Sequence, residues 1–187
     1  MRKKLLTINS IIIMLSLFFS MILLSKYFSF SWPFQIKAFP TPLFLFICAR
    51  TFRYLLEKGH NKAIDKVLGK VNFSSNNFSL INHGSCTSIH IDPIKGEFLI
   101  IDCKSFGRPK ARGYNFEQWG GYEIDNNVAK ITFKFNDFEF PAFSIYAKSR
   151  PDAKVFCNKL DIMCSPSYSP KDERSFYKHV QQSLATA

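Results

Sequence analysis

The segment "TSIHIDPIKGEFLIID", residues 87–102, has the pattern of a β-hairpin and decides the fold class of this chain. Apolar residues alternate with polar ones in its first half, and a second apolar run follows. Between them lies Pro-Ile-Lys-Gly, residues 93–96, a composition typical of a β-turn. A period of two places apolar side chains on one face of a strand, so we expect the two runs to pair antiparallel.

Further strands are expected after this hairpin. The stretch "VAKITFKFNDFEFPAFSIYA", residues 128–147, predicts a second hairpin that turns at Asn136-Asp137. Shorter strand patterns occur at residues 80–83, 111–116 and 120–125, and "WGGYE", residues 119–123, is interpreted as a break between strands. The sequence therefore predicts six or seven antiparallel strands.

Helical spacing replaces strand spacing near the C-terminus. In "PDAKVFCNKLDIM", residues 151–163, the apolar residues share one helix face, and Pro151-Asp152 is a start signal. A second helix is predicted in "SPKDERSFYKHVQQSLA", with Ser169 as N-cap and Pro170 at its first position. Its narrow apolar stripe, Phe176, Val180 and Leu184, fits docking on its own domain or on a partner.

This order of elements resembles the pleckstrin-homology-like (PH-like) fold of bacteria, a bent antiparallel β-sheet with a C-terminal helix. The resemblance covers residues 80–163 and rests on "SIHIDPIKGEFLIID", "ITFKFNDFEFPAFSIYA" and "DAKVFCNKL". It implies an α+β chain with a PH-like domain at 76–164 and a C-terminal loop and helix at 165–187. A membrane anchor before such a domain is similar to small plasmid and phage proteins, including plasmid entry-exclusion proteins. An unrelated α+β sheet is the alternative.

The N-terminus predicts a transmembrane helix. After three cations, 20 residues from Leu5 to Leu24 carry no charge. At about 1.5 Å per residue they span about 30 Å, the thickness of the bilayer's hydrocarbon core. The alternative is a cleaved signal peptide, which has a shorter apolar core and a small-x-small cleavage site.

A second apolar stretch, "WPFQIKAFPTPLFLFICAR", is interrupted by prolines, and its part from Leu43 to Ala49 is too short to span alone. It is expected to form the return leg of a hairpin or to lie in the interface, so residues 1–49 form the anchor. Cations flank both ends of this region, which favours a bacterial inner-membrane protein with a cytoplasmic C-terminal domain. A single pass with an external domain is the alternative.

The net charge of +11 is concentrated near the apolar region, because residues 1–75 carry +9 of it. This distribution predicts membrane lipids rather than nucleic acid as partners. Residues 50–71 are expected to form a basic amphipathic helix whose lysines recur at every fourth position. This lysine stripe either faces anionic headgroups or is the solvated face of a helix packed on its own domain. It consists of Lys58, Lys62, Lys66 and Lys70.

A second cationic cluster lies in "CKSFGRPKARGYNF", residues 103–116, where four cations fall within nine residues that contain no acid. Within the PH-like resemblance, a basic loop between early strands is a place where anionic headgroups dock. We therefore expect a site for phosphate or an acidic protein, with an ordinary solvated loop as the alternative. The candidate ligand-binding residues are Lys104, Arg108, Lys110 and Arg112.

No catalytic or metal-binding pattern stands out. The sequence has no G-x-S-x-G motif and no glycine-rich phosphate loop before a helix, and His83, Cys86 and His90 match no standard zinc spacing. Five cysteines without regular spacing favour thiols in a reducing compartment. With an external domain, Cys103–Cys157 or Cys86–Cys164 disulfides are the alternative.

These features predict a membrane-anchored, non-enzymatic binding module without a cofactor or metal. Its expected ligand is an anionic lipid or a protein partner in a membrane complex, with plasmid entry exclusion as the candidate role. The alternative is a structural subunit of an envelope or transfer complex.

Overall fold

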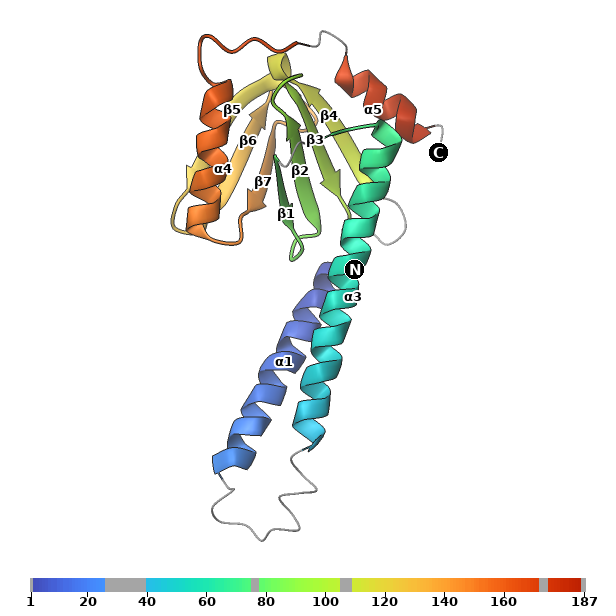
Figure 1. Cartoon of the computed structure of the whole chain (residues 1–187), viewed down its shortest axis with the longest axis vertical. Coiled ribbons are helices and arrows are strands. Elements are labelled where there is room, and N and C mark those ends of the chain that lie inside the picture. Colours follow the sequence, from blue (N-terminus) through green and yellow to red (C-terminus); the bar gives the residue numbers. More distant parts are fainter. Residues whose placement is uncertain (1, 26–39, 75–77, 105–108, 172–174, 186–187) are drawn as a thin grey trace. The chain divides into compact units, whose positions relative to one another are not determined.

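The computed structural model in Figure 1 describes residues 2–25, 40–74, 78–104, 109–171 and 175–185. The chain divides into two compact units, Met1–Asn61 and Lys62–Ala187, and each is described by itself.

The first unit is helical. Helix α1 (Arg2–Ser25) and the first part of helix α3 (Pro40–Val71) run in opposite directions (Figure 1). The sequence predicted a boundary between anchor and connecting helix at residue 50, but α3 continues through it without interruption. Pro40 and Pro42 lie in the first turn of α3, where a helix tolerates proline because the first N–H groups have no acceptor within the helix.

Both helices of this unit expose many large apolar side chains. None of the helices in the described part of the chain combines the length and the apolar character needed to cross a membrane. The exposed apolar side chains of the first unit, each at least two-fifths accessible, are Ile8, Ile11, Ile12, Met14, Leu15, Phe18, Phe19, Phe44, Ile47, Phe52, Tyr54 and Leu55.

The second unit contains two antiparallel sheets, so the predicted α+β class is confirmed. The larger sheet has the order β1-β2-β3-β4 and the smaller one β5-β6-β7 (Figure 1). The predicted hairpin at residues 87–102 is β2 and β3, whose pairing runs from Thr87↔Asp102 to Asp92↔Glu97. The strands are β1 (Ser79–Asn82), β2 (Thr87–Asp92), β3 (Glu97–Asp102), β4 (Lys110–Asn115), β5 (Trp119–Asp125), β6 (Lys130–Phe135) and β7 (Ala142–Tyr146).

Two details of the predicted strands are corrected. The Gly120-Gly121 pair does not separate two strands but lies inside β5, where the pairing with β6 shifts register. Gly121 has a φ of 99°, which glycine adopts readily, so the pair forms a bulge rather than a break. The second hairpin turns through residues 136–141, a longer connection than the predicted Asn136-Asp137 turn.

The main core lies between the two sheets and helix α4 (Arg150–Met163). The predicted buried face of α4 is confirmed, because Ala153, Phe156, Leu160 and Met163 are all buried in this core. Ser149 caps the helix, its side chain accepting a hydrogen bond from the Asp152 backbone N–H.

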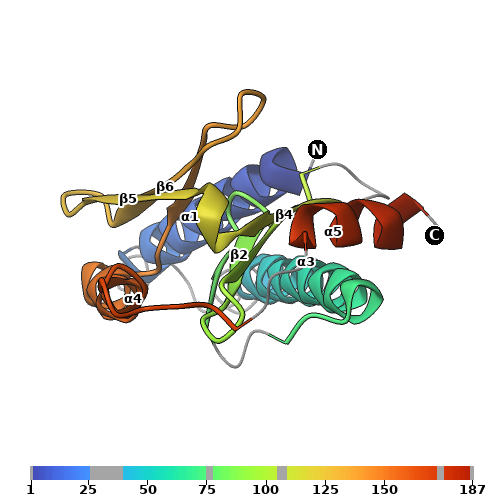
Figure 2. The same ribbon diagram turned by 90° about the horizontal axis from the view of Figure 1, so that it is seen from above.

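The opposite face of the larger sheet is also covered. Helix α5 (Phe176–Ala185) packs against β4, and both views place α4 and α5 at opposite sides of the two sheets (Figures 1 and 2). Gly113 permits the close approach, because a Cβ there would lie 2.6 Å from the Val180 Cγ2 atom. The end of α3 joins this layer, since His179 Nε2 lies 2.9 Å from the Val71 carbonyl oxygen.

The predicted start of the last helix at Ser169 and Pro170 is wrong, because α5 begins at Phe176. The preceding segment packs instead on the β2–β3 turn. The Tyr168 hydroxyl donates to the Pro93 carbonyl at 2.7 Å, and the Lys171 N–H donates to the Ile94 carbonyl at 3.0 Å. These hydrogen bonds keep residues 168–171 in a non-helical conformation. The stripe of α5 packs on its own domain, with Phe176 and Val180 buried.

The lysine stripe is exposed along α3, at Lys58, Lys62, Lys66 and Lys70. In the part of α3 that belongs to the second unit, Ile64, Val67 and Val71 are buried. The predicted separation of lysines from apolar residues is therefore confirmed there. The apolar face of this part of α3 packs within the second unit, so its lysines remain accessible to solvent or to a membrane surface.

Candidate functional site

The cationic residues of the β3–β4 region contribute to a cavity of about 440 Å³. The cavity lies between the inner face of the larger sheet and strand β7. Its lining residues come from the β1–β2 turn, from β2, β3 and β4, and from the β6–β7 connection with β7.

Strand register explains why distant residues meet here. Thr87 pairs with Asp102, and Asp102 pairs with Lys110, so one row crosses β2, β3 and β4. Ile100 and Arg112 pair in the next row of the same face. Because successive side chains alternate between faces, these rows share the face that holds the core and extend it toward one end of the sheet.

The cations are only partly neutralised within the cavity. Lys104 Nζ lies 3.0 Å from Asp102 Oδ2, and the Lys104 N–H donates to Asp102 Oδ1 at 2.9 Å. The Lys104 and Asp102 side chains are 55% and 37% exposed, so this ion pair adds little to the stability of the fold. Its main effect is to orient the Lys104 side chain. With one carboxylate set against three cations in the lining, the cavity keeps a net positive charge.

Arg112 and Phe140 of the β6–β7 connection together form one wall of the cavity. The Arg112 guanidinium carbon lies 4.6 Å from the centre of the Phe140 ring, a cation–π contact. Next to it, the Tyr114 hydroxyl donates to Asp137 Oδ2 at 2.9 Å. These contacts attach residues 136–141 to β4 and fix the Arg112 side chain at the cavity.

The same contacts shift two pKa values. Burial, together with the hydrogen bond to Asp137, raises the pKa of Tyr114 to about 12. Partial burial tends to raise the pKa of Asp137, but hydrogen bonds from Tyr114 and from the Glu139 and Phe140 N–H groups, with the positive charge of Arg112, lower it overall. Asp137 is therefore a carboxylate and Tyr114 a neutral donor at neutral pH.

Hydroxyl groups complete the polar part of the lining. Ser85 Oγ lies 2.6 Å from Thr87 Oγ1 at the cavity. The Ser144 hydroxyl, in contrast, lies 2.9 Å from Thr132 Oγ1 on the face of the smaller sheet that points away from the core, because it alternates with the buried Phe143 and Ile145. Hydroxyl groups can donate to anionic oxygens and guanidinium binds them in a planar fork, so the lining suits a phosphate or carboxylate.

Three of the four predicted binding residues contribute to this cavity. Lys104, Lys110 and Arg112 line it, whereas Arg108 lies outside the described residues. Sequence reasoning missed the opposite wall, formed by Phe140 and the residues of β7. The alternation in "PAFSIYA" predicted a strand, but no local signal shows which strand lies across from it.

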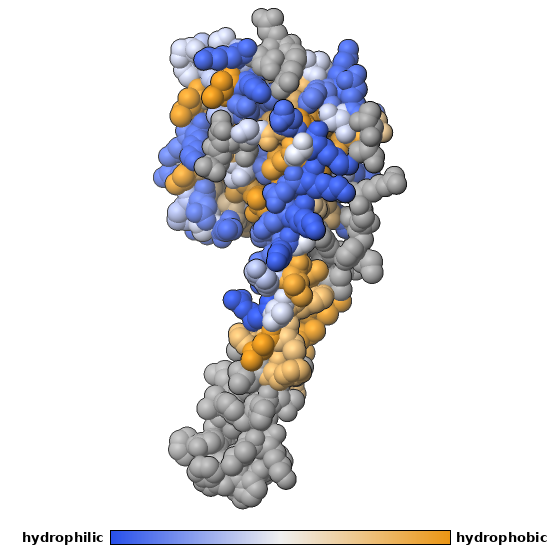
Figure 3. Space-filling view, turned by 45° about the vertical axis from the view of Figure 1, so that its right-hand side comes forward, coloured by the Kyte–Doolittle hydropathy of each residue, from blue (hydrophilic) through white to orange (hydrophobic). Residues whose placement is uncertain are grey.

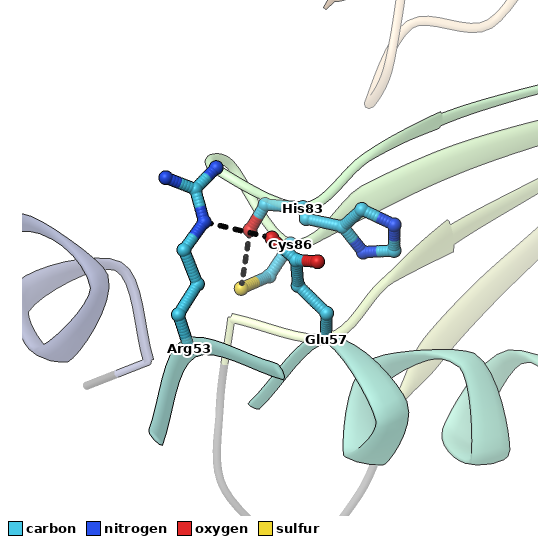
Figure 4. Close-up of polar contacts among 4 residues, drawn as sticks. All are labelled: Arg53, Glu57, His83 and Cys86. Carbon is cyan, nitrogen blue, oxygen red and sulfur yellow. Dashed lines mark hydrogen bonds and ion pairs between the residues drawn. The ribbon is translucent and has the colours of Figure 1, made fainter. Parts of the chain in front are cut away.

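The histidines and cysteines near the cavity have structural contacts. The Cys86 thiol donates to the His83 carbonyl oxygen at 3.4 Å, drawn in Figure 4 together with the Arg53–Glu57 ion pair within α3. His90 Nε2 lies 3.0 Å from the Ser88 hydroxyl. All five cysteines are thiols, so neither of the two alternative disulfides is formed. Burial raises the pKa of Cys157 to about 11, which keeps that thiol protonated.

The surface of the second unit is predominantly hydrophilic on the face shown in Figure 3, with small apolar patches between polar residues. In the first unit the described residues on the same face are mostly hydrophobic (Figure 3). Comparison of the chain with protein-family models, with curated proteins and with solved structures gives no match.

Proposed function

We propose that this chain is a membrane-anchored, non-enzymatic binding module that holds an anionic group in the cavity between β4 and β7. The observation that carries this proposal is the convergence of Lys104, Lys110 and Arg112 on one cavity. A phosphate of an anionic lipid and a carboxylate of a protein partner offer the same oxygens to these cations. Asp102, the one acid among the described lining residues, is paired with Lys104, which favours binding over acid–base chemistry.

The PH-like resemblance supports a binding role. What supports the resemblance is the order of seven antiparallel strands followed by a helix, α4, that packs into the core, although the strands form two sheets rather than the expected single bent one and α5 follows α4. In that resemblance a basic loop between early strands docks anionic headgroups, and here Lys104 lies in the β3–β4 connection and Lys110 is the first residue of β4.

Membrane attachment is proposed from the first unit. A group of twelve large exposed apolar side chains on two helices is more than a soluble surface ordinarily carries, and such a patch marks a membrane or protein contact. The 20 uncharged residues from Leu5 to Leu24 add to this. We propose that residues 1–49 anchor the chain in a bacterial inner membrane, with the sheet domain on the cytoplasmic side.

The candidate biological role is plasmid entry exclusion, in which the domain would bind a component of a membrane complex. The alternative, a structural subunit of an envelope or transfer complex, draws on the same exposed apolar helices, since a protein can cover them as well as lipid can. Crosslinking in cells distinguishes the two, because a subunit has one dominant stoichiometric partner.

The test compares two triple variants that remove the same charge. The first carries Lys104→Gln, Lys110→Gln and Arg112→Gln in the cavity, and the second carries Lys62→Gln, Lys66→Gln and Lys70→Gln on the lysine stripe. Full-length protein in neutral detergent micelles is titrated with hexaglutamate and, separately, with inorganic phosphate. We expect the cavity variant to bind at least about tenfold more weakly, since each lost charged hydrogen bond costs about 1.5–3 kcal/mol.

The stripe variant should weaken binding by a smaller factor, through long-range attraction alone. Equal losses in the two variants would show that net charge, not the cavity, attracts the anion. Binding of neither probe by the native chain would remove the proposed function.

A further inference from the structure

We propose that an extended segment of a partner protein adds to the free edge of β7 as a further strand and sets an acidic side chain against Lys104, Lys110 and Arg112. This inference rests on the proposed function, because it uses the same cationic cavity, and it commits the anionic group to a protein partner.

The first observation is the position of β7 at the end of its sheet. Among the strands that the structure describes, the order β5-β6-β7 leaves one side of β7 without a strand neighbour in that sheet. Strand β1 lies near β7 without pairing with it as a strand, and Asn82 Nδ2 donates to the Tyr146 carbonyl at 2.8 Å. An exposed strand edge is a template on which another chain can pair.

The second observation is the phase of the β6–β7 hydrogen bonds. Phe135 N–H donates to the Pro141 carbonyl at 2.9 Å, and Ala147 N–H donates to the Ala129 carbonyl at 3.0 Å. Hydrogen-bonded pairs alternate along an antiparallel ladder, so Phe143 and Ile145 direct their backbone groups toward β6.

The intervening residues of β7 therefore direct their N–H and C=O groups away from β6. These residues are Ala142, Ser144 and Tyr146, all of which line the cavity and are exposed. Because the Tyr146 carbonyl already accepts from Asn82, the groups that face the cavity for pairing are those of Ala142 and Ser144.

The third observation is that β7 lacks the usual protection of an edge strand. Its sequence, Ala-Phe-Ser-Ile-Tyr, contains no charge and no proline, the features that keep natural edges from pairing. The positive charge lies instead on the facing wall, at Lys110 and Arg112. A lipid headgroup would use this charge but not a row of backbone donors and acceptors, whereas an acidic strand uses both.

The chemistry of the expected segment follows. Alternate side chains of an added strand point to opposite sides, so acidic residues on one side would face Lys110 and Arg112. Phe140 and Phe143 in the same lining offer apolar contact to a neighbouring residue. The recognised segment is therefore extended and acidic, with at least one apolar residue.

The experiment selects random ten-residue peptides displayed on phage against the full-length chain in detergent micelles. The most enriched peptide, and the same peptide N-methylated at alternate residues, are then the probes. We expect enrichment of acidic peptides, and a loss of about fivefold to tenfold in affinity for each N-methyl group that removes a strand hydrogen bond.

A variant of β7 tests the same strand hydrogen bond by removing its donor from this chain instead of from the peptide. Ser144→Pro removes the N–H that faces away from β6, and edge strands tolerate proline at such positions. We expect the peptide to bind the variant about fivefold to tenfold more weakly. The control is Thr132→Ala on β6, which removes the hydroxyl partner of Ser144 and leaves the β7 backbone unchanged.

Hydrogen exchange of the native chain keeps the test independent of how Ser144→Pro folds. Addition of the peptide should slow exchange at the Ala142 and Ser144 amides and should change little at Phe143 and Ile145, which already bond to β6.

The outcomes separate this inference from the proposed function. Strand addition is overturned, and anion binding left intact, if the selected peptide binds equally well after N-methylation. The same conclusion follows if the selection yields no acidic peptides while phosphatidylglycerol vesicles bind through the cavity cations. Failure of the cavity cations to affect any anionic probe would overturn both.

Discussion

At the scale of single residues, the hydrogen bond from Tyr114 to Asp137 connects the β6–β7 connection to the cavity wall. The prediction concerns Tyr114→Phe, which removes only the hydroxyl group. Because Tyr114 is fully buried, we expect the free energy of unfolding to fall by about 1 kcal/mol, measured by chemical denaturation.

The same variant should change the dependence of stability on pH. The folded protein lowers the pKa of Asp137 below its ordinary value of 3.8. A lowered pKa stabilises the fold above the unfolded-state pKa, and this contribution is lost as pH falls through the folded-state value. Without the Tyr114 donor the pKa of Asp137 should rise, so the variant loses less stability between neutral and acid pH.

Tyr168→Phe is the matched control, because it removes a hydroxyl that donates to a backbone carbonyl, which does not titrate. It should lower the free energy of unfolding by about 1 kcal/mol, and by the same amount at every pH from roughly 3 to 7. An unchanged Asp137 titration in Tyr114→Phe, followed by NMR, would contradict the assigned contact.

At the scale of elements, the docking of α5 on β4 depends on Gly113. In Gly113→Ala the new methyl group would lie 2.6 Å from Val180 Cγ2 and 2.8 Å from Phe176 Cδ1, so α5 must move. We expect a loss of about 1–3 kcal/mol in the free energy of unfolding, the usual range for overpacking.

The control is Gly69→Ala in the last turns of α3, where a Cβ would have no neighbour within 4 Å. Alanine has the higher helix propensity, so this variant should stabilise the chain by about 0.5 kcal/mol. Denaturation curves of equal midpoint for the two variants would contradict the docking of α5 through Gly113.

The elements also show what local sequence can predict. The alternation at residues 87–102 and the helical spacing of Ala153, Phe156, Leu160 and Met163 are local patterns, and the structure confirms both. The start of α5 was mispredicted because Ser169 and Pro170 form a typical helix-start signal. Hydrogen bonds from the neighbouring Tyr168 and Lys171 to the β2–β3 turn keep this segment in a non-helical conformation.

The cavity was predictable only on one side. Lys104, Lys110 and Arg112 are close in sequence, so the sequence alone predicted that they cluster in the structure. Phe140 and Ser144 join them through long-range sheet packing, which no local pattern encodes. Exposed backbone groups on β7 follow from strand order, and sequence does not reveal strand order.

At the scale of the whole molecule, two units of different surface character share one chain. The second unit buries most of its large apolar residues in two layers around the larger sheet and exposes a few, such as Phe138 and Ile162, whereas twelve large apolar side chains are exposed among the described residues of the first unit. Burying an exposed side chain of this size is favourable by about 1.5–3 kcal/mol, so the first unit should partition into lipid. The proposal that this chain works at a membrane depends on that partition.

The most direct test of this account is fractionation of cells that express the full-length chain, with the membranes washed in high salt and then in carbonate at high pH. We predict that the chain stays in the membrane pellet through both washes and is released by detergent. The variant with Lys62→Gln, Lys66→Gln and Lys70→Gln should stay there too, because apolar burial rather than surface charge retains the chain. Recovery of the native chain as a soluble species without detergent would contradict the account.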